Sequence, residues 1–170
     1  MSDHVDFVLA QWRAALPDTP VDDMAVVSRL FRLAVVATRE VETTFKQHGL
    51  NQGEFDVLAT VYRSGAPYRL TPQRLIDALL LSSGAMTNRL DRLTSAGWIV
   101  REPNPEDRRS LYVTLTAAGR EKTDAVLHDY LAALARLTAP LDATQHTQLA
   151  LLLKSLLTDH DSRAKGGITA

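Results

Sequence analysis

The sequence predicts a mainly α-helical protein with one small β-hairpin, arranged as a winged helix-turn-helix flanked by longer helices. Apolar residues recur at helical spacing through most of the chain. Two short helical segments, 73–80 and 84–96, follow each other across a tight turn. Directly after them, residues 98–102 and 110–115 read as two short strands, and apolar and polar residues alternate in the second.

The N-terminal third predicts two helices of different length. Asp3 to Ala15 is weakly amphipathic, and Pro17 and Pro20 then interrupt the pattern. A long helix is expected from Met24 to about His48, with Gly49 as its C-terminal stop. Its apolar stripe consists of Val27, Leu30, Phe31, Ala34, Val35, Val41 and Phe45.

Capping residues mark the helices of the central region. Asn51 with Glu54 resembles a capping box at the start of a helix that runs to about Tyr62. Thr71-Pro72 places an N-cap and a first-turn proline before the helix 73–80. Ser82 and Ser83 cap the helix 84–96, which Gly97 ends.

A hairpin and two further helices complete the chain. Residues 98–102 and 110–115 read as strands joined by a polar turn. Thr116 caps a helix expected to reach about Leu137. After Pro140, Asp142 and Gln145 resemble another capping box before a leucine-rich last helix. Residues 161–170 are expected to be a disordered tail.

Composition excludes several classes of protein. The chain has 170 residues, 45% of them hydrophobic, and a net charge of −1, which argues against a disordered chain. No apolar run is long enough for a membrane span, and no secretory signal precedes the first helix, so a cytoplasmic protein is expected. Cysteine is absent, which removes disulfides and thiolate chemistry. Between Leu58 and Arg101 the sequence has six arginines and only two acidic residues, so positive charge is concentrated in the middle of the chain.

No residue pattern predicts catalysis or a cofactor. The five histidines are scattered and form no i, i+4 pair, so no metal site is expected. The serines and histidines form no triad-like set around an elbow motif. The chain is therefore not expected to be an enzyme.

The predicted fold suggests contact with double-stranded DNA. The second helix of the pair would enter the major groove, and its exposed face carries Ser82, Ser83, Thr87, Asn88 and Arg92. At the tip of the hairpin, Arg108 and Arg109 could enter a narrow minor groove. The alternative is a winged helix used for protein contacts, with the two arginines merely solvated.

Two segments resemble the MarR family of transcriptional regulators. The hairpin run 107–119, with Asp107-Arg108-Arg109-Ser110 and Ala117-Ala118-Gly119, looks like the family's wing, and 87–93 resembles its recognition helix. The resemblance implies a homodimer, a pseudo-palindromic operator and a small molecule that weakens DNA binding. On this basis we assign residues 1–48 and 120–160 to dimerisation and 49–119 to DNA binding. Whether the protein represses or activates stays open.

One position departs from the family pattern. Asn88 follows Thr87 where many members have arginine, and Arg89 stands where an apolar residue is common. Position 89 lies on or beside the buried stripe, where a charge is costly unless it is paired. We therefore expect an acidic partner or an anionic ligand for Arg89, with Asp56 as the natural candidate.

A further set of residues resembles the urate-responsive branch of the family. Trp12, Asp56, Arg63, Arg89 and Arg101 match the positions of that branch. The resemblance implies a pocket for a small planar anion, in which arginine forks bind the anion, Trp12 stacks and Asp56 accepts a ring hydrogen. Urate is one candidate, and other carboxylate, phenolic or xanthine-type compounds are the others. The alternative is that Asp56, Arg89 and Arg101 form a structural ion network.

Overall fold

A computed structural model describes residues 2–105, 107 and 109–166, with side chains described up to residue 160. The chain divides into two compact units, residues 1–133 and 134–170, and each is described by itself. The fold is mainly helical with one small antiparallel sheet, so the predicted fold class is confirmed. No helix within these described ranges is long and apolar enough to cross a membrane.

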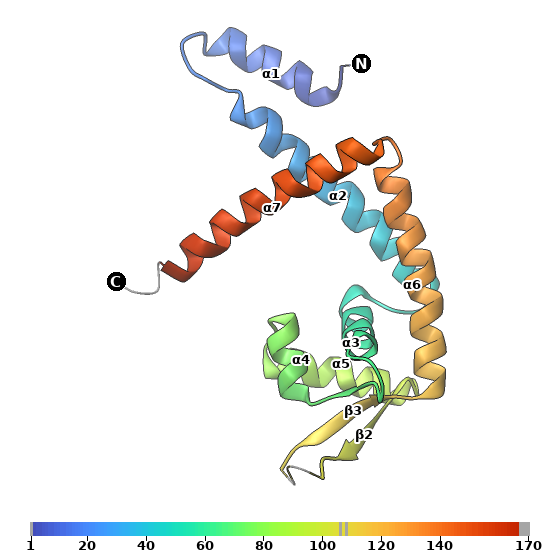
Figure 1. Cartoon of the computed structure of the whole chain (residues 1–170). Coiled ribbons are helices and arrows are strands. Elements are labelled where there is room, and N and C mark those ends of the chain that lie inside the picture. The colour runs from blue at the N-terminus through green and yellow to red at the C-terminus, as the bar shows by residue number, and fades with distance from the viewer. Residues whose placement is uncertain (1, 106, 108, 167–170) are drawn as a thin grey trace. The chain divides into compact units, whose positions relative to one another are not determined.

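Two helices open the first unit. α1 (His4–Ala15) starts with a capping box between Asp3 and Asp6, and α2 (Asp23–Gln47) follows after a loop. Their contact contains a small apolar cluster of Val5, Leu9 and Val21. Arg29 of α2 adds bonds to both capping carboxylates, at 2.9 Å to Asp3 and 2.6 Å to Asp6. Arg13 of α1 also pairs with Asp22, directly before α2, at 2.8 Å. α1 and α2 follow each other at the N-terminal end of the chain (Figure 1).

Three capped helices form the centre of the first unit. α3 (Gln52–Arg63), α4 (Pro72–Leu79) and α5 (Ser83–Ser95) begin at Asn51, Thr71 and Ser82, the predicted caps. α4 ends because Leu80 takes a left-handed conformation, with φ of 51°. This residue makes the tight turn of the helix-turn-helix.

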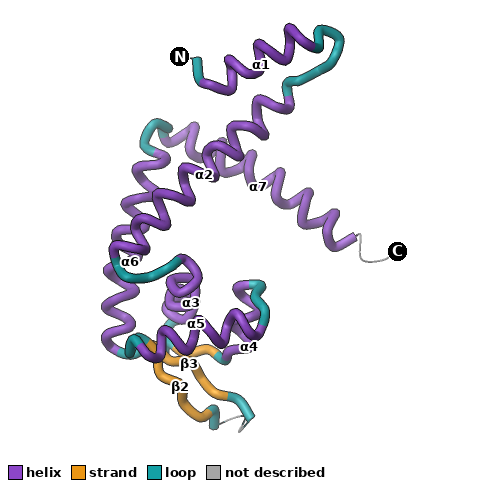
Figure 2. The backbone as a smooth tube through the Cα atoms, turned by 180° about the vertical axis from the view of Figure 1, so that it is seen from behind, coloured by secondary structure: helices purple, strands orange, loops and turns teal. Residues whose placement is uncertain are grey.

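The described strands form one three-stranded antiparallel sheet in the order β1-β3-β2 (Figure 2). β2 (Ile99–Pro103) and β3 (Leu111–Leu115) are the predicted hairpin, and we call them with their connecting turn the wing. β1 (Arg69–Leu70) was not expected, and it pairs with Val113 and Thr114 of β3. The sheet thereby joins the wing to the segment that precedes α4.

The core of the first unit surrounds α3. Val57, Leu58 and Val61 of α3 are fully buried, and they belong to one cluster with residues of α4, α5 and the sheet. Phe45 and Phe55 have ring centroids 4.7 Å apart, and Tyr130 stacks on Phe45 at 5.5 Å. This aromatic group links the end of α2, α3 and α6 (Ala117–Thr138).

The start of α6 is packed directly against the base of the wing. The hydroxyl of Thr116 accepts a bond from the N–H of Gly119 at 2.9 Å, which caps the helix as predicted. Gly119 lies so close to the backbone of Trp98 that a Cβ there would collide with its carbonyl oxygen. The close approach therefore requires glycine.

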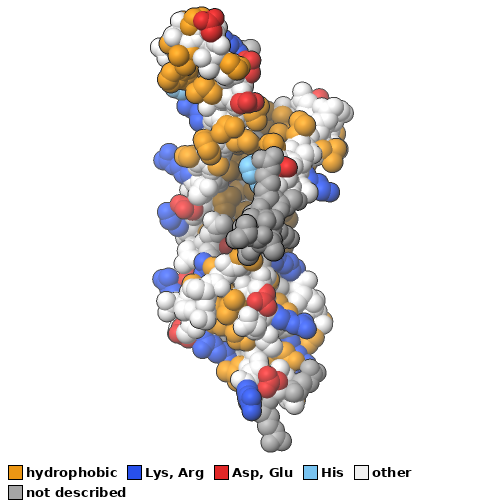
Figure 3. Space-filling model, turned by 90° about the vertical axis from the view of Figure 1, so that its left-hand side faces the viewer, with side chains coloured by type: hydrophobic (Ala, Val, Ile, Leu, Met, Phe, Trp, Pro, Cys, Tyr) orange, Lys and Arg blue, Asp and Glu red, His pale blue; other side chains and the backbone are white. Residues whose placement is uncertain are grey.

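The second unit contains the end of α6 and α7 (Ala143–Gly166). α7 begins with the predicted capping box of Asp142 and Gln145. It extends to residue 166, into the range expected as a disordered tail, and residues 167–170 lie outside the described part. Hydrophobic side chains are visible at the molecular surface (Figure 3). Within this chain the exposed ones of α2 and α7 include Val27, Phe31, Val35, Leu149, Leu152, Leu156 and Leu157.

Candidate nucleic-acid interface and effector site

α5 has one buried apolar face and one exposed polar face. Met86, Leu90 and Leu93 pack into the core. The expected DNA-contacting residues of this helix are exposed; they are Ser82, Ser83, Thr87, Asn88 and Arg92. Ser82 uses its hydroxyl to accept from the N–H of Ala85 at 3.4 Å, so it caps the helix. The polar face thus starts at a helix N-terminus, where backbone N–H groups favour a phosphate.

Arg92 has a structural partner that the sequence did not reveal. Its Nε lies 3.2 Å from Oε1 of Glu54, whose side chain is only 8% exposed while that of Arg92 is 72% exposed. Glu54 also closes the capping box at the start of α3. Arg92 therefore joins α5 to α3 while most of its surface stays open to solvent.

The wing presents Arg109 at its tip. This residue is exposed, and its backbone N–H donates to Oδ1 of Asp107 at 3.0 Å. The N–H of Ser110 donates to the carbonyl of Asp107, which closes the turn. Arg108 lies outside the described residues.

Arg89 does not form the ion pair expected with Asp56. Among the ion pairs of the described residues, none joins these two side chains, and the guanidinium instead donates to the carbonyl of Gly53 at 3.4 Å. Glycine at position 53 makes room for it, since an added Cβ would lie 2.5 Å from Cζ of Arg89. The expectation was an acidic partner or an anionic ligand: in place of the acidic partner the arginine bonds to backbone at a helix start, and the anionic ligand stays a prediction.

Asp56 and Arg63 lie together in a hollow of about 290 Å³ between α3 and α6. Its other lining residues are Phe55, Ala59, Tyr62, Thr123, Leu127 and Tyr130. Burial raises the pKa of the Asp56 carboxyl, and the charges of Arg89 and Arg63 oppose that rise. Among the described residues no cation forms an ion pair with this half-buried carboxylate, and Arg63 beside it is exposed, so it can accept a hydrogen bond from a bound molecule.

Tyr62, which lines this α3–α6 hollow, forms a hydrogen bond across it to α6. Tyr62 bonds to the carboxylate of Asp124 on α6, and this bond raises the pKa of the tyrosine hydroxyl. The hydroxyl is thereby held as a donor to α6.

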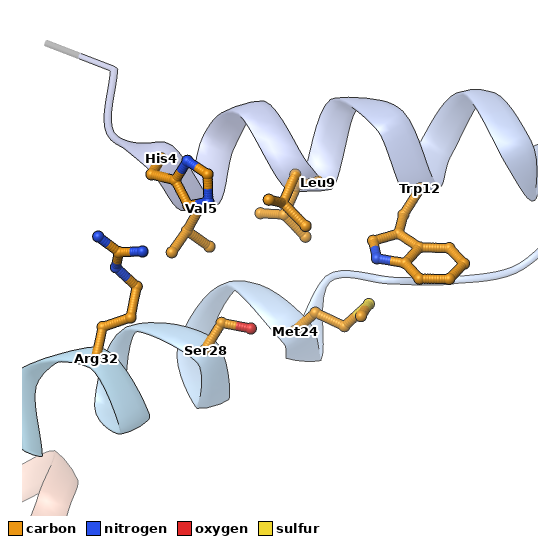
Figure 4. Close-up of a pocket in the computed structure, with 8 residues that line it drawn as sticks. His4, Val5, Leu9, Trp12, Met24, Ser28 and Arg32 are labelled. Atoms are coloured by element: carbon orange, nitrogen blue, oxygen red, sulfur yellow. The ribbon is translucent and has the colours of Figure 1, made fainter. Parts of the chain in front are cut away.

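The remaining expected ligand residues lie elsewhere in the chain. Arg101 on β2 bonds to Asp91 of α5 at 2.6 Å. Trp12 lines a separate hollow between α1 and α2, with Met24 and Arg32 among its neighbours (Figure 4). The structure therefore brings Asp56 and Arg63 together, sets Arg89 nearby at Gly53, and places neither Trp12 nor Arg101 in the same hollow. The alternative of one ion network of Asp56, Arg89 and Arg101 is also not found among the described residues, since Arg101 pairs with Asp91 and Arg89 bonds to the carbonyl of Gly53.

The described residues contain no group of three or more histidine or acidic side chains that could hold a metal ion. His48 instead bonds to Asp129 at 2.8 Å, and bonds from His128 and His48 lower the pKa of that carboxyl. His48 thereby joins the end of α2 to α6, whereas His128 bonds to its own neighbour on α6.

The chain is similar to known transcriptional regulators. A model described as MarR family matches residues 48–110. The chain is 35% identical over 149 residues to the HTH-type transcriptional regulator PecS of Dickeya dadantii, covering 88% of this chain and 90% of that protein. It is 35% identical over 111 residues to the multiple antibiotic resistance protein MarR of Salmonella typhimurium, covering 61% of this chain and 71% of that protein. These relatives are regulators and not enzymes, as the sequence predicts.

Solved structures agree with this result. A mutant MarR from E. coli, complexed with operator DNA, superposes with a TM-score of 0.67 at 28% identity, covering 82% of this chain and 99% of that one. AbsC from Streptomyces coelicolor shares the fold with a TM-score of 0.74 at 20% identity, covering 85% and 97%. The fold, the capped helix pair with its wing, and the similarity to PecS over most of both chains lead to one conclusion: this chain belongs to the MarR family.

Proposed function

We propose that the protein is a homodimeric transcriptional repressor that binds a pseudo-palindromic operator and is released by a small anion. The observation that carries the proposal is the exposed polar face of α5, which begins at a capped N-terminus beside a wing bearing Arg109. The similarity to a MarR structure in complex with operator DNA supports it. α5 would lie in the major groove, with the wing in the adjacent minor groove.

The side chains of α5 suit the two tasks of DNA recognition. Asn88 offers an amide that can bond to the edge of adenine, while Ser83 and Thr87 can bond to phosphate or base edges. Arg92 and Arg89 hold α5 on the first turn of α3 through Glu54 and Gly53. A helix fixed in this way keeps the side chains that would contact the bases in a constant orientation.

The apolar faces of α2 and α7 support the homodimer. Phe31 and Val35 are each 70% exposed, and Leu152 and Leu157 are 64% and 65% exposed in the single chain. Exposed apolar surface of this extent is typical of an interface. Two copies related by a two-fold axis would present two α5 helices to two half-sites.

The α3–α6 hollow is the proposed effector site. A planar monoanion such as urate could donate a ring N–H to Asp56 and accept from Arg63, with Arg89 within reach at Gly53. Such a ligand would compete for the guanidinium that anchors α5. Arg101 would act through its bond to Asp91 on α5, and Trp12 would enter the site only through a rearrangement or a second copy.

The first test is fluorescence anisotropy with a duplex selected from random DNA by the full-length protein. We expect tight binding with a clear preference over a scrambled duplex, and a loss of that preference in Asn88→Ala. No enriched sequence, with Asn88→Ala behaving as wild type, would favour a winged helix that contacts proteins.

The second test adds urate to the preformed complex at fixed salt. Release by urate, with Arg63→Gln still dimeric and DNA-bound but unresponsive, would support the effector site. Arg89→Ala should lose the response to urate and also bind DNA more weakly, since it lacks the anchor of α5. A normal urate response in Arg63→Gln or in Arg89→Ala would remove this site from the proposal. An operator complex indifferent to urate would keep the regulator and direct the search to other planar anions.

A further inference from the structure

The carboxylate of Glu54 has a different partner on each of its two oxygens. Oε2 accepts from the backbone N–H of Asn51 at 3.0 Å and so closes the capping box of α3. Oε1 lies 3.2 Å from Nε of Arg92 on α5. The side chain of Glu54 is only 8% exposed, and a buried carboxylate is costly unless its oxygens are paired. The buried side of the Arg92 guanidinium is thus held by a group that is itself fixed at a helix start.

This contact leaves the outer end of Arg92 available. It uses Nε, the guanidinium nitrogen nearest to the backbone, and 72% of the Arg92 side chain is exposed. The two terminal amino groups can therefore donate to a further partner. They form a planar fork, which matches the O6 and N7 acceptors that guanine presents in the major groove.

Arg92 lies on the polar face of α5. It follows the exposed Asn88 by four positions, so both side chains share one side of the helix. The buried side of the helix consists of Met86, Leu90 and Leu93. Arg89 also contacts the first turn of α3, but it is partly buried and donates to a backbone carbonyl. Of these two arginines, Arg92 is therefore the one that is both anchored and open to a base.

We propose that Arg92 recognises a guanine in each operator half-site and that Glu54 is its positioning residue. The proposal rests on the proposed function, in which α5 enters the major groove. A free arginine side chain populates many rotamers, and ordering them on binding costs affinity. A guanidinium already held at Nε has fewer conformations to lose, and it is restrained from turning towards a phosphate or a neighbouring base.

A base analogue tests the contact with guanine. The wild-type protein is first used to select a duplex from random DNA. Each guanine of a half-site is then replaced in turn by 7-deazaguanine, which keeps Watson–Crick pairing but lacks the N7 acceptor. We expect one replacement to weaken wild-type binding about tenfold, as for the loss of one charge-assisted bond. Arg92→Ala should be insensitive to that replacement and should lose the preference for guanine at that base pair alone.

A matched pair of variants tests the role of Glu54. Glutamine can also close a capping box, so Glu54→Gln keeps an acceptor for the N–H of Asn51 and removes the negative charge beside Arg92. Glu42→Gln is the control, since Glu42 pairs with Lys46 on α2. We expect Glu54→Gln to reduce the discrimination at the guanine pair several-fold and to keep the base preferences elsewhere, while Glu42→Gln changes none of them. In an Arg92→Ala background, Glu54→Gln should have no further effect on discrimination.

Two results would overturn the inference and leave the proposed function intact. One is an Arg92→Ala protein that keeps both the guanine preference and the sensitivity to 7-deazaguanine. The other is a Glu54→Gln protein in which discrimination falls equally at all base pairs or does not fall, which would give the carboxylate a structural role only. If the wild-type protein enriches no sequence, the proposed function fails and the inference fails with it. Circular dichroism of each variant verifies that the helices are intact.

Discussion

Arg89 packs against Gly53, the glycine in the first turn of α3. Its guanidinium lies against Gly53, donates to the carbonyl there, and still reaches Asp56 electrostatically. Gly53 and Gly84 both occupy the second position of a capped helix, in α3 and α5. Only Gly53 is approached by another side chain, because nothing lies within 4 Å of a Cβ at Gly84.

This difference predicts opposite results for two matched substitutions. Alanine in place of helical glycine gains up to about 1 kcal/mol of stability. Gly84→Ala should show part of that gain in urea unfolding. Gly53→Ala should not, because its Cβ displaces the guanidinium of Arg89.

A double-mutant cycle isolates the cause. In an Arg89→Ala background the Gly53→Ala gain should reappear, giving a coupling free energy of about 1 kcal/mol, while Gly84→Ala should be unaffected by Arg89. Additive effects of Gly53→Ala and Arg89→Ala would show that the guanidinium is not seated on Gly53.

Asp56 predicts a pH-dependent stability difference. Burial raises the pKa of its carboxyl above the ordinary value of 3.8, so the ionised form costs stability in the folded protein. That cost is absent below the unfolded pKa and develops as the pH rises through the folded pKa. Asp56→Asn should therefore gain stability relative to wild type as the pH rises from about 3 to about 7, measured by chemical unfolding. A constant difference across this range would contradict the assigned shift.

The sequence could predict which side chains are chemically notable but not all of their partners. Helical spacing indicated that Arg89 borders a buried stripe, and it does. Spacing carries no information on a backbone carbonyl of another helix, so Gly53 was not found. The pair of Arg92 and Glu54 was hidden for the same reason, since Glu54 was already explained by its capping box.

At the scale of elements, α1 is held by Arg29 as well as by a small apolar core. Its buried contacts are confined to Val5 and Leu9 with Val21, whereas Arg29 bonds to both carboxylates of the capping box. The bond from Arg29 lowers the pKa of the Asp3 carboxyl, and the backbone bond from Asp3, followed by the bond from Arg29, lowers the pKa of the Asp6 carboxyl. Arg29→Ala should lower hydrogen-exchange protection of residues 4–15 several-fold while α3 to α5 keep theirs. Arg39→Ala is the control, and equal protection of α1 in both variants would count against the role of Arg29.

Loss of Arg109 from the wing should change the salt dependence of DNA binding. Arg109 is exposed at the tip, so its loss would remove about one phosphate or groove contact under the proposed function. Arg109→Ala should weaken binding to specific and scrambled duplexes alike and reduce the salt slope by about one. Titrations at several salt concentrations measure it, with Arg39→Ala as the matched loss of charge on α2. Equal slopes in the two variants would place the wing tip away from DNA.

Elements with their own capping chemistry were predictable, and the shortest one was not. Asn51, Thr71, Ser82, Thr116 and Asp142 each cap a helix as expected, because a cap is a local bond between residues three apart. β1 has two residues, too few to show an alternating pattern, and it exists only because β3 offers a free edge. Its pairing is non-local and leaves no periodicity in the sequence.

For the whole molecule, the exposed leucines of α7 predict an association equilibrium. Leu149, Leu152 and Leu156 share one face of the helix and are 36%, 64% and 46% exposed. Leu152→Glu would place a charge in the proposed dimer interface and should shift the protein to monomer in sedimentation velocity. Lys154→Glu is the control on the same helix and should sediment as wild type. A Leu152→Glu protein that remains dimeric would exclude this face from the interface.

The fold class and the family were predictable for the whole chain, whereas the assembly of the effector site was not. The change from helical spacing to strand alternation and the residues of the wing can each be read from short stretches of sequence. The positions of Trp12 and Asp56 in different hollows depend on how α1 packs on α2, which involves only a few apolar contacts. Weak packing of this kind leaves little trace in a pattern of hydrophobic residues.

The contact of Gly119 with the backbone of Trp98 joins the start of α6 to the base of the wing. Because the first turn of α6 packs against the base of the wing with no room for a Cβ, we expect a shift of α6 to be transmitted to the wing. Thr123 and Leu127, one and two turns further along α6, line the hollow that contains Asp56. A molecule that pushes α6 away from α3 at the hollow would therefore also displace the wing.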